Sequence, residues 1–244
     1  MSKLAGAPLQ EVITEIRWSL TTDQERNDYQ FLTGDLYGLV SEKFPHREVV
    51  IPAGLPLEVF MGRPALRFRT SEKGYPLIQI GPGILTINTV GNEYDWDTHS
   101  KDIEFVLTNF FTASNIEGKS VNVTLAYIDF FEFEFEKANA LEYLAKHLNT
   151  QLNFGFIDTG EMPKIFNITI GYTEEVGTVN VNIARGNNPS GDDGIAIQTN
   201  VIMESLEFEQ KGIEGRLDAA HAWCSELFKK MTRGDLYDSY VSKT

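Results

Sequence analysis

The order in which strands and helices are predicted constrains this chain more than any single motif does. Strands are predicted where apolar and polar residues alternate, and helices where apolar residues recur every three or four positions. The first half reads as strand, helix, short strands and helix, over 12–20, 23–45, 57–60, 65–70, 75–80, 84–90 and 95–114. The second half repeats that order, over 127–136, 141–148, 165–173, 176–184, 195–202 and 217–231.

The repeated order predicts an α+β protein of two tandem β-α-β-β-β-α units, 1–118 and 119–244, packed as one globule. The boundary is expected at 114–120. Placed edge to edge, the units would form one long curved antiparallel sheet with helices on one face, a shape like that of TATA-binding and helix-grip folds. The two halves share an order of strands and helices but not an amino-acid sequence. An internal duplication and a chance likeness between two α+β segments therefore both stay open.

The clearest strand ends at 131–136, where phenylalanine and glutamate alternate. Three phenylalanines take one side of the strand and three glutamates take the other. We therefore expect these glutamates to extend the solvent side of the sheet with negative charge.

If helices cover the apolar side of each strand, the opposite side faces solvent or a ligand. The side chains expected there are mostly amides and hydroxyls, with two arginines: Arg67, Arg69, Asn167, Thr169, Asn180, Asn182, Gln198 and Asn200. Asparagine is a poor strand former, so its repeated use calls for a reason. One reason is a hydrogen-bonding platform for a peptide, a protein or a small ligand; the other is an ordinary solvated face. The candidate binding residues are Arg67, Arg69, Asn167, Asn180, Asn182 and Asn200.

Signals for catalysis or metal binding are weak. Three aspartates and His99 within 95–102 could hold a hard metal, but acidic residues also satisfy free amides in a first helical turn. His221 and Cys224 suggest a nucleophile, whereas a core histidine and a buried thiol explain them more simply. The loop 187–194 lacks the spacing of a calcium-binding loop and suits a hairpin connection. The sequence predicts no catalytic residue, metal or cofactor.

Composition restricts the kinds of partner. The chain has 21 Lys plus Arg against 35 Asp plus Glu, a formal net charge of −14, which disfavours general binding to nucleic acid or anionic lipid. No apolar stretch approaches the roughly 20 residues that span a bilayer, and the opening residues contain no secretory signal. The single cysteine, Cys224, makes no intramolecular disulfide. These features predict a cytoplasmic protein.

Motifs at the start, middle and end of the chain resemble a sporadically distributed prokaryotic family of uncharacterised proteins of about this length. The residues that carry the resemblance are Ala7-Pro8-Leu9, Glu11-Val12, Glu15-Ile16-Arg17, Gly81-Pro82-Gly83, Asn88, Tyr94, Trp96, Leu217-Asp218-Ala219-Ala220-His221, Phe228 and Met231-Thr232. The resemblance implies a bacterial or archaeal protein of accessory or defence-associated gene neighbourhoods. It implies no activity, cofactor or catalytic residue.

Three functions fit these observations. The leading hypothesis is a non-enzymatic interaction module that binds a protein through the open sheet face or its acidic surface. An alternative is a small-molecule-binding protein or enzyme, with Asp95, His99, Arg67 and Arg69 as its polar groups. Another is an acidic, antitoxin-like inhibitor of a nucleic-acid-acting partner. Because open sheets expose edge strands, we also expect a homodimer.

Overall fold

A computed structural model describes residues 6–52, 54–91, 93–116, 118–153 and 165–241. The first half contains β1 (Leu9–Trp18), α1 (Asp23–Val40), β2 (His46–Val49), η1 (Leu57–Phe60), β3 (Leu66–Arg69), β4 (Leu77–Gly81), β5 (Ile84–Val90) and α2 (Trp96–Ala113). The second half contains β6 (Ser120–Glu132), α3 (Ala140–His147), β7 (Asn167–Glu174), β8 (Gly177–Asn187), β9 (Asp193–Glu207), α4 (Gln210–Thr232) and α5 (Asp235–Val241). The predicted α+β class is confirmed.

The strands form one antiparallel sheet in the order β2-β3-β4-β5-β1-β6-β9-β8-β7. In each half the first strand pairs with the last strand of that half, β1 with β5 and β6 with β9. β1 also pairs with β6 along its length, which joins the halves into one sheet. The two halves therefore share a connectivity, to which the first half adds β2 at its edge.

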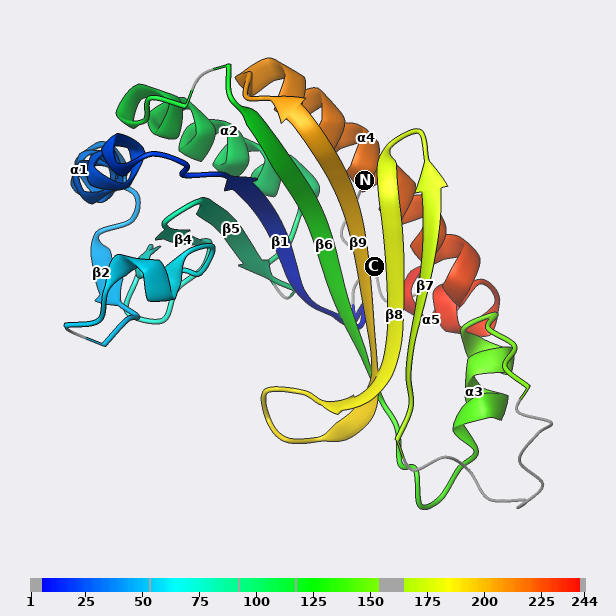
Figure 1. Cartoon of the computed structure of the whole chain (residues 1–244). Helices are drawn as coiled ribbons and strands as arrows, with labels where there is room; N and C mark the ends of the chain where they lie inside the picture. The colour runs from blue at the N-terminus through cyan, green and yellow to red at the C-terminus, as the bar shows by residue number, and fades with distance from the viewer. Residues whose placement is uncertain (1–5, 53, 92, 117, 154–164, 242–244) are drawn as a thin grey trace.

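The sheet bends into an arch, with α1, α2 and α4 along its convex side (Figure 1). Along β1, Val12, Ile16 and Trp18 point to this helix layer and are buried, while Glu11 and Arg17 have the opposite parity. We call the sheet side opposite these helices the open face.

The core fills the space between the sheet and the helix layer. Ile103, Val106 and Phe110 of α2 and Leu217 and Cys224 of α4 are buried there. Each helix packs an apolar stripe against the sheet, so two layers bury both. Leu77, Ile84 and Phe130 have the opposite parity and are also buried, so the sheet carries apolar residues on the open face too. Among the helices of the described ranges, none has the length and apolar character needed to cross a membrane.

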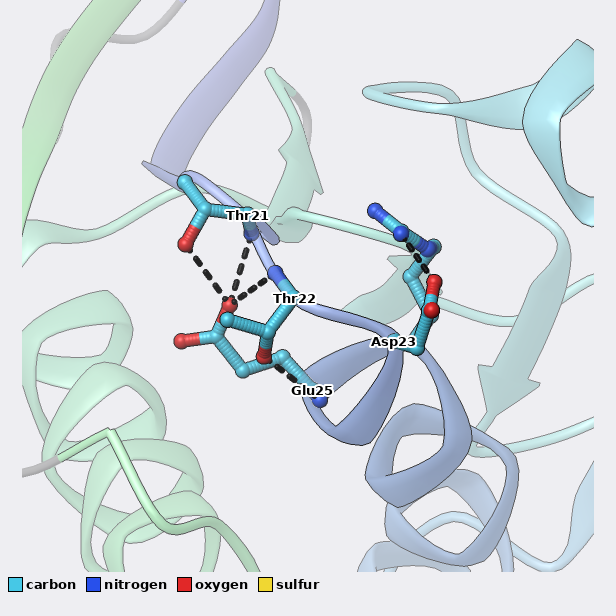
Figure 2. Close-up of polar contacts among 5 residues, drawn as sticks. Thr21, Thr22, Asp23 and Glu25 are labelled. Carbon is cyan, nitrogen blue, oxygen red and sulfur yellow. Dashed lines mark hydrogen bonds and ion pairs between the residues drawn. The ribbon is translucent and has the colours of Figure 1, made fainter.

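Helix α1 begins with a reciprocal cap (Figure 2). The Thr22 hydroxyl accepts from the Glu25 N–H at 3.2 Å, and the Glu25 carboxylate accepts from the N–H groups of Thr21 at 2.6 Å and Thr22 at 2.9 Å. This arrangement satisfies amides that have no partner inside the helix. Lys119 forms an ion pair with the same carboxylate. Lys119 and these N–H groups lower the pKa of Glu25.

Some predicted elements differ from the observed ones. The segment 57–60 is a 3-10 helix, where Pro56 directly precedes it, instead of a strand. Strand β2 was missed because all its residues are exposed and show no apolar alternation. The short helix α5 was also missed. Strand β6 ends at Glu132, so the glutamates at 134 and 136 lie beyond the sheet.

Candidate functional site

The strand registers place all six candidate binding residues on the open face. They are Arg67 and Arg69 on β3, Asn167 on β7, Asn180 and Asn182 on β8, and Asn200 on β9. Their neighbours along the strands, such as Phe68 and Val181, are buried toward the helix layer. Binding of a partner by these residues stays a prediction.

An uncharged polar patch covers the open face of β7, β8 and β9. We call it the amide platform, and it consists of Asn167, Thr169, Asn180, Asn182, Gln198 and Asn200. The Asn182 amide donates to Asn167 Oδ1 at 2.5 Å and to Thr169 Oγ1 at 2.9 Å, and Gln198 Nε2 donates to Asn200 Oδ1 at 3.0 Å. Each side-chain amide has two donor hydrogens and an acceptor oxygen, so these bonds do not use all the hydrogen-bonding groups of the platform. The platform can therefore exchange further hydrogen bonds with a ligand.

In the first half, by contrast, the polar groups of the open face bond to one another. Arg67 Nε donates to Gln79 Oε1 at 2.9 Å, Gln79 Nε2 donates to Thr86 Oγ1 at 3.3 Å, and Asn88 Nδ2 donates to Glu11 Oε1 at 2.8 Å. Thr86 and Asn88 are buried. This network holds neighbouring strands together. The sequence did not indicate this network, because it depends on which strands are neighbours in the sheet.

The two arginines are paired with an acidic residue. Glu48 on β2 lies 3.4 Å from Arg67 Nη1 and 3.4 Å from Arg69 Nε. In the sheet order β3 lies six positions from β8, so Arg67 and Asn182 are roughly 30 Å apart along the sheet at the usual strand spacing. A small ligand cannot contact both groups, whereas a protein can.

An exposed apolar segment lies at the first-half end of the arch. Its exposed large side chains are Val49, Val50, Leu55, Val59 and Met61. Arg17 of the open face donates from Nη1 to the carbonyl of Gly62 at 2.9 Å, which fixes the end of this segment against β1. Exposed apolar side chains that form a contiguous patch mark interaction sites. The sequence analysis predicts no binding residue in this segment.

The catalytic group proposed from Asp95, His99 and the two β3 arginines is not assembled. His99 is 1 % exposed and lies on the helix side, with Nε2 3.2 Å from Thr14 Oγ1 and Nδ1 2.9 Å from Thr89 Oγ1. Asp95 caps α2. The arginines lie on the opposite side of the sheet. Burial lowers the pKa of His99 to about 4, so the ring is neutral at pH 7.

Residues from distant parts of the chain meet between α2 and α4. The Trp96 ring stacks on the His221 ring at 4.1 Å between centroids, and Trp96 Nε1 donates to Asp218 at 3.0 Å. The Tyr127 hydroxyl lies 2.7 Å from His221 Nδ1 and 2.6 Å from the Tyr94 hydroxyl. We call these five residues the Trp96 cluster. Tyr94 and Trp96 come from the first half of the chain and the other three residues from the second, so the cluster joins the two halves.

Asp129 is a buried acid on the helix side of β6. It is 6 % exposed, and within the described part of the chain its carboxyl group has no hydrogen bond or ion pair. Burial raises its pKa to about 7. Burial also raises the pKa of the Cys224 thiol to about 12. A thiol protonated at neutral pH is a poor nucleophile, which disfavours the catalytic interpretation of Cys224.

No three His, Cys, Asp or Glu of the described ranges lie close enough to hold a metal ion. The acidic residues of 95–102 have different partners. Asp95 caps α2, and Asp102 pairs with Lys43. The loop 187–194 connects β8 to β9, and Asn188 Oδ1 accepts from the N–H groups of Ser190 and Asp192. Its side chains thus stabilise a hairpin turn.

A pocket of about 120 Å³ opens beside the helix layer, between α1 and the end of α2. This volume corresponds to about four water molecules. Trp18, Tyr29 and Phe31 contribute to its wall, and Glu25 and Lys119 pair there. It contains none of the predicted binding residues.

Comparisons of the chain with protein-family models, with curated proteins and with solved structures found no match.

Proposed function

We propose that this chain is a non-enzymatic protein-interaction module, acting in the cytoplasm of a bacterium or archaeon within an accessory or defence-associated system. Its partner binds the open face. The observation that carries this proposal is the amide platform, a set of uncharged hydrogen-bonding groups on three adjacent strands with no α1, α2 or α4 above it. The prokaryotic setting rests on the family resemblance.

The width of the surface favours a protein over a small molecule. Stable protein interfaces bury about 800 Å² on each partner, with apolar anchors beside polar groups. The open face offers the amide platform on the second half. At the other end Gly62, bonded to Arg17 of the open face, brings the exposed apolar segment to the margin of that face, although Val49 itself has helix-side parity. A partner bridging them gains hydrogen bonds from the first region and apolar burial from the second.

Co-expression with the products of flanking genes, followed by calorimetry on each purified complex, tests the proposal. The test variant carries Asn180→Lys and Asn182→Lys, which put two charges on the amide platform. The control carries Asn27→Lys and Gln30→Lys, the same charge change on exposed positions of α1. We expect the platform variant to lose at least about tenfold in affinity and the control to bind like the wild type, since buried unpaired charge is costly at an interface.

Two results would overturn this assignment. Equal binding by the two variants would place the interface elsewhere. Affinity that falls steeply with added salt and is unaffected by the platform variant would favour the acidic inhibitor, because salt screens charge attraction.

A further inference from the structure

The two edges of the sheet differ in how well they are protected from pairing with another strand. The β2 edge has only four residues, and three of them are His46, Arg47 and Glu48. Charge and shortness are the usual protections of an edge strand. The β7 edge has eight residues and carries no charged side chain before Glu174. Among the described residues no strand pairs with its outer side, so it can serve as a template for strand addition.

The register shows which backbone groups of β7 are free to pair. The Arg185 N–H donates to the Phe166 carbonyl at 3.2 Å, which makes these residues a hydrogen-bonded pair with β8. Bonded and non-bonded pairs alternate along an antiparallel ladder. The N–H and C=O groups of the odd-numbered residues from Asn167 to Thr173 consequently point to the outer edge, and all four of these residues are exposed.

The side chains of β7 also suit a further strand. On the helix side lie Ile168, Ile170 and Tyr172, and Tyr172 is 50 % exposed. On the open face lie Asn167, Thr169, Gly171 and Thr173. An added strand would extend an apolar row on one side and a polar row on the other.

We propose that β7 pairs with β7 of a second copy of this chain, antiparallel, about a two-fold axis at Ile170. In this register Ile170 faces Ile170 of the other copy, and Ile168 faces Tyr172. Thr169 faces Gly171, and Asn167 faces Thr173. The outward N–H and C=O groups of the odd-numbered residues then all find partners. Apolar residues meet apolar residues, and no two carboxylates are opposed.

Symmetry and charge identify a second copy as the occupant. A two-fold axis perpendicular to the sheet keeps both helix layers on the same side, so each apolar row continues into its equivalent. The neutral strand lets two chains, each with net charge −14, meet where no like charges are adjacent. Long-range repulsion persists, so the dimer should tighten as salt is added.

Cysteine cross-linking tests the register. Ile170→Cys places two thiols on the axis at a non-hydrogen-bonded pair, where Cα atoms are about 4.5 Å apart and a disulfide fits. Tyr172→Cys is the matched control, because its equivalent in the other copy is displaced along the strand. Native Cys224 is buried. We expect disulfide-linked dimer from Ile170→Cys under mild oxidation and far less from Tyr172→Cys.

Light scattering on fractions from size-exclusion chromatography measures the molar mass of the protein and so tests whether the β7 edge forms a dimer. Tyr172→Lys adds a charge to the helix side of β7, outside the amide platform, and Val49→Lys adds one to the exposed β2 edge. We expect a wild-type dimer that Tyr172→Lys converts to monomer and Val49→Lys leaves intact. A monomeric wild type, or equal cross-linking at positions 170 and 172, would overturn the proposal. A monomer that still binds its partner would leave the function proposed for the open face standing.

Discussion

Replacing Asp129 by asparagine should stabilise this protein, and the gain should appear above about pH 4 and be complete above about pH 7. Asp129 is 6 % exposed, and the described residues provide its carboxyl group with no hydrogen bond or counter-ion. Ionisation of such a group costs free energy that is not recovered. Asparagine has nearly the same shape and cannot ionise, so the substitution removes this cost with little change in packing.

The magnitude follows from the two pKa values. Burial raises the pKa of Asp129 from 3.8 to about 7. Between these pH values the folded state holds a proton that the unfolded state has lost, so the stability of the wild type falls as pH rises. The gap of about 3 pH units, at 1.36 kcal/mol each, amounts to about 4 kcal/mol above pH 7. Below pH 4 the difference between variant and wild type should vanish.

Urea unfolding followed by circular dichroism at about pH 5 and about pH 8 measures this difference. Glu72→Gln, at an exposed position, is the control and should change stability by less than about 0.5 kcal/mol at either pH. Histidine titrations affect wild type and variant equally and cancel. A difference for Asp129→Asn that does not grow with pH would refute the argument from burial.

Three further outcomes are expected in the same unfolding assay. Burial lowers the pKa of His99 from 6.5 to about 4, so the free energy of unfolding should fall by about 3 kcal/mol as pH falls through that range. His99→Gln, made in the Asp129→Asn background, should flatten this dependence of stability on pH. Trp96→Phe removes the indole N–H bond to Asp218 and should cost about 1 kcal/mol. Gly91→Ala would bring its Cβ to 1.7 Å from the Leu9 carbonyl oxygen and should lower the free energy of unfolding by about 3 kcal/mol or more. Gly34→Ala, where α1 has open space for a Cβ, should raise it by about 1 kcal/mol.

The fold could be predicted from sequence wherever one face of an element is buried. Alternation along β1 and the spacing of Ile103, Val106 and Phe110 in α2 both report a single apolar side. Strand β2 could not be found this way because none of its residues is buried. The strand predicted at 57–60 is wrong for another reason, because these residues follow Pro56 and form a 3-10 helix.

The candidate site was predictable in part for the same reason. The parity of Asn180 and Asn182 against Val179 and Val181 places the amides on the open face without knowledge of the strand order. The sequence could not reveal that Glu48 pairs with the arginines, because that contact depends on which strands are neighbours. The meeting of Trp96 with His221, far apart in the chain, was equally inaccessible.

The seam between β1 and β6 has a practical consequence. Both strands belong to the middle of the sheet, and the backbone link between their halves runs through the short stretch that follows α2. Cutting there would leave two polypeptides, each with one side of a long central strand unpaired. Two residues of the Trp96 cluster would stay with the first piece and three with the second. We expect that neither piece folds well alone and that the two reassemble when mixed. The chain could then be used as a split protein, whose two pieces report the proximity of the proteins fused to them.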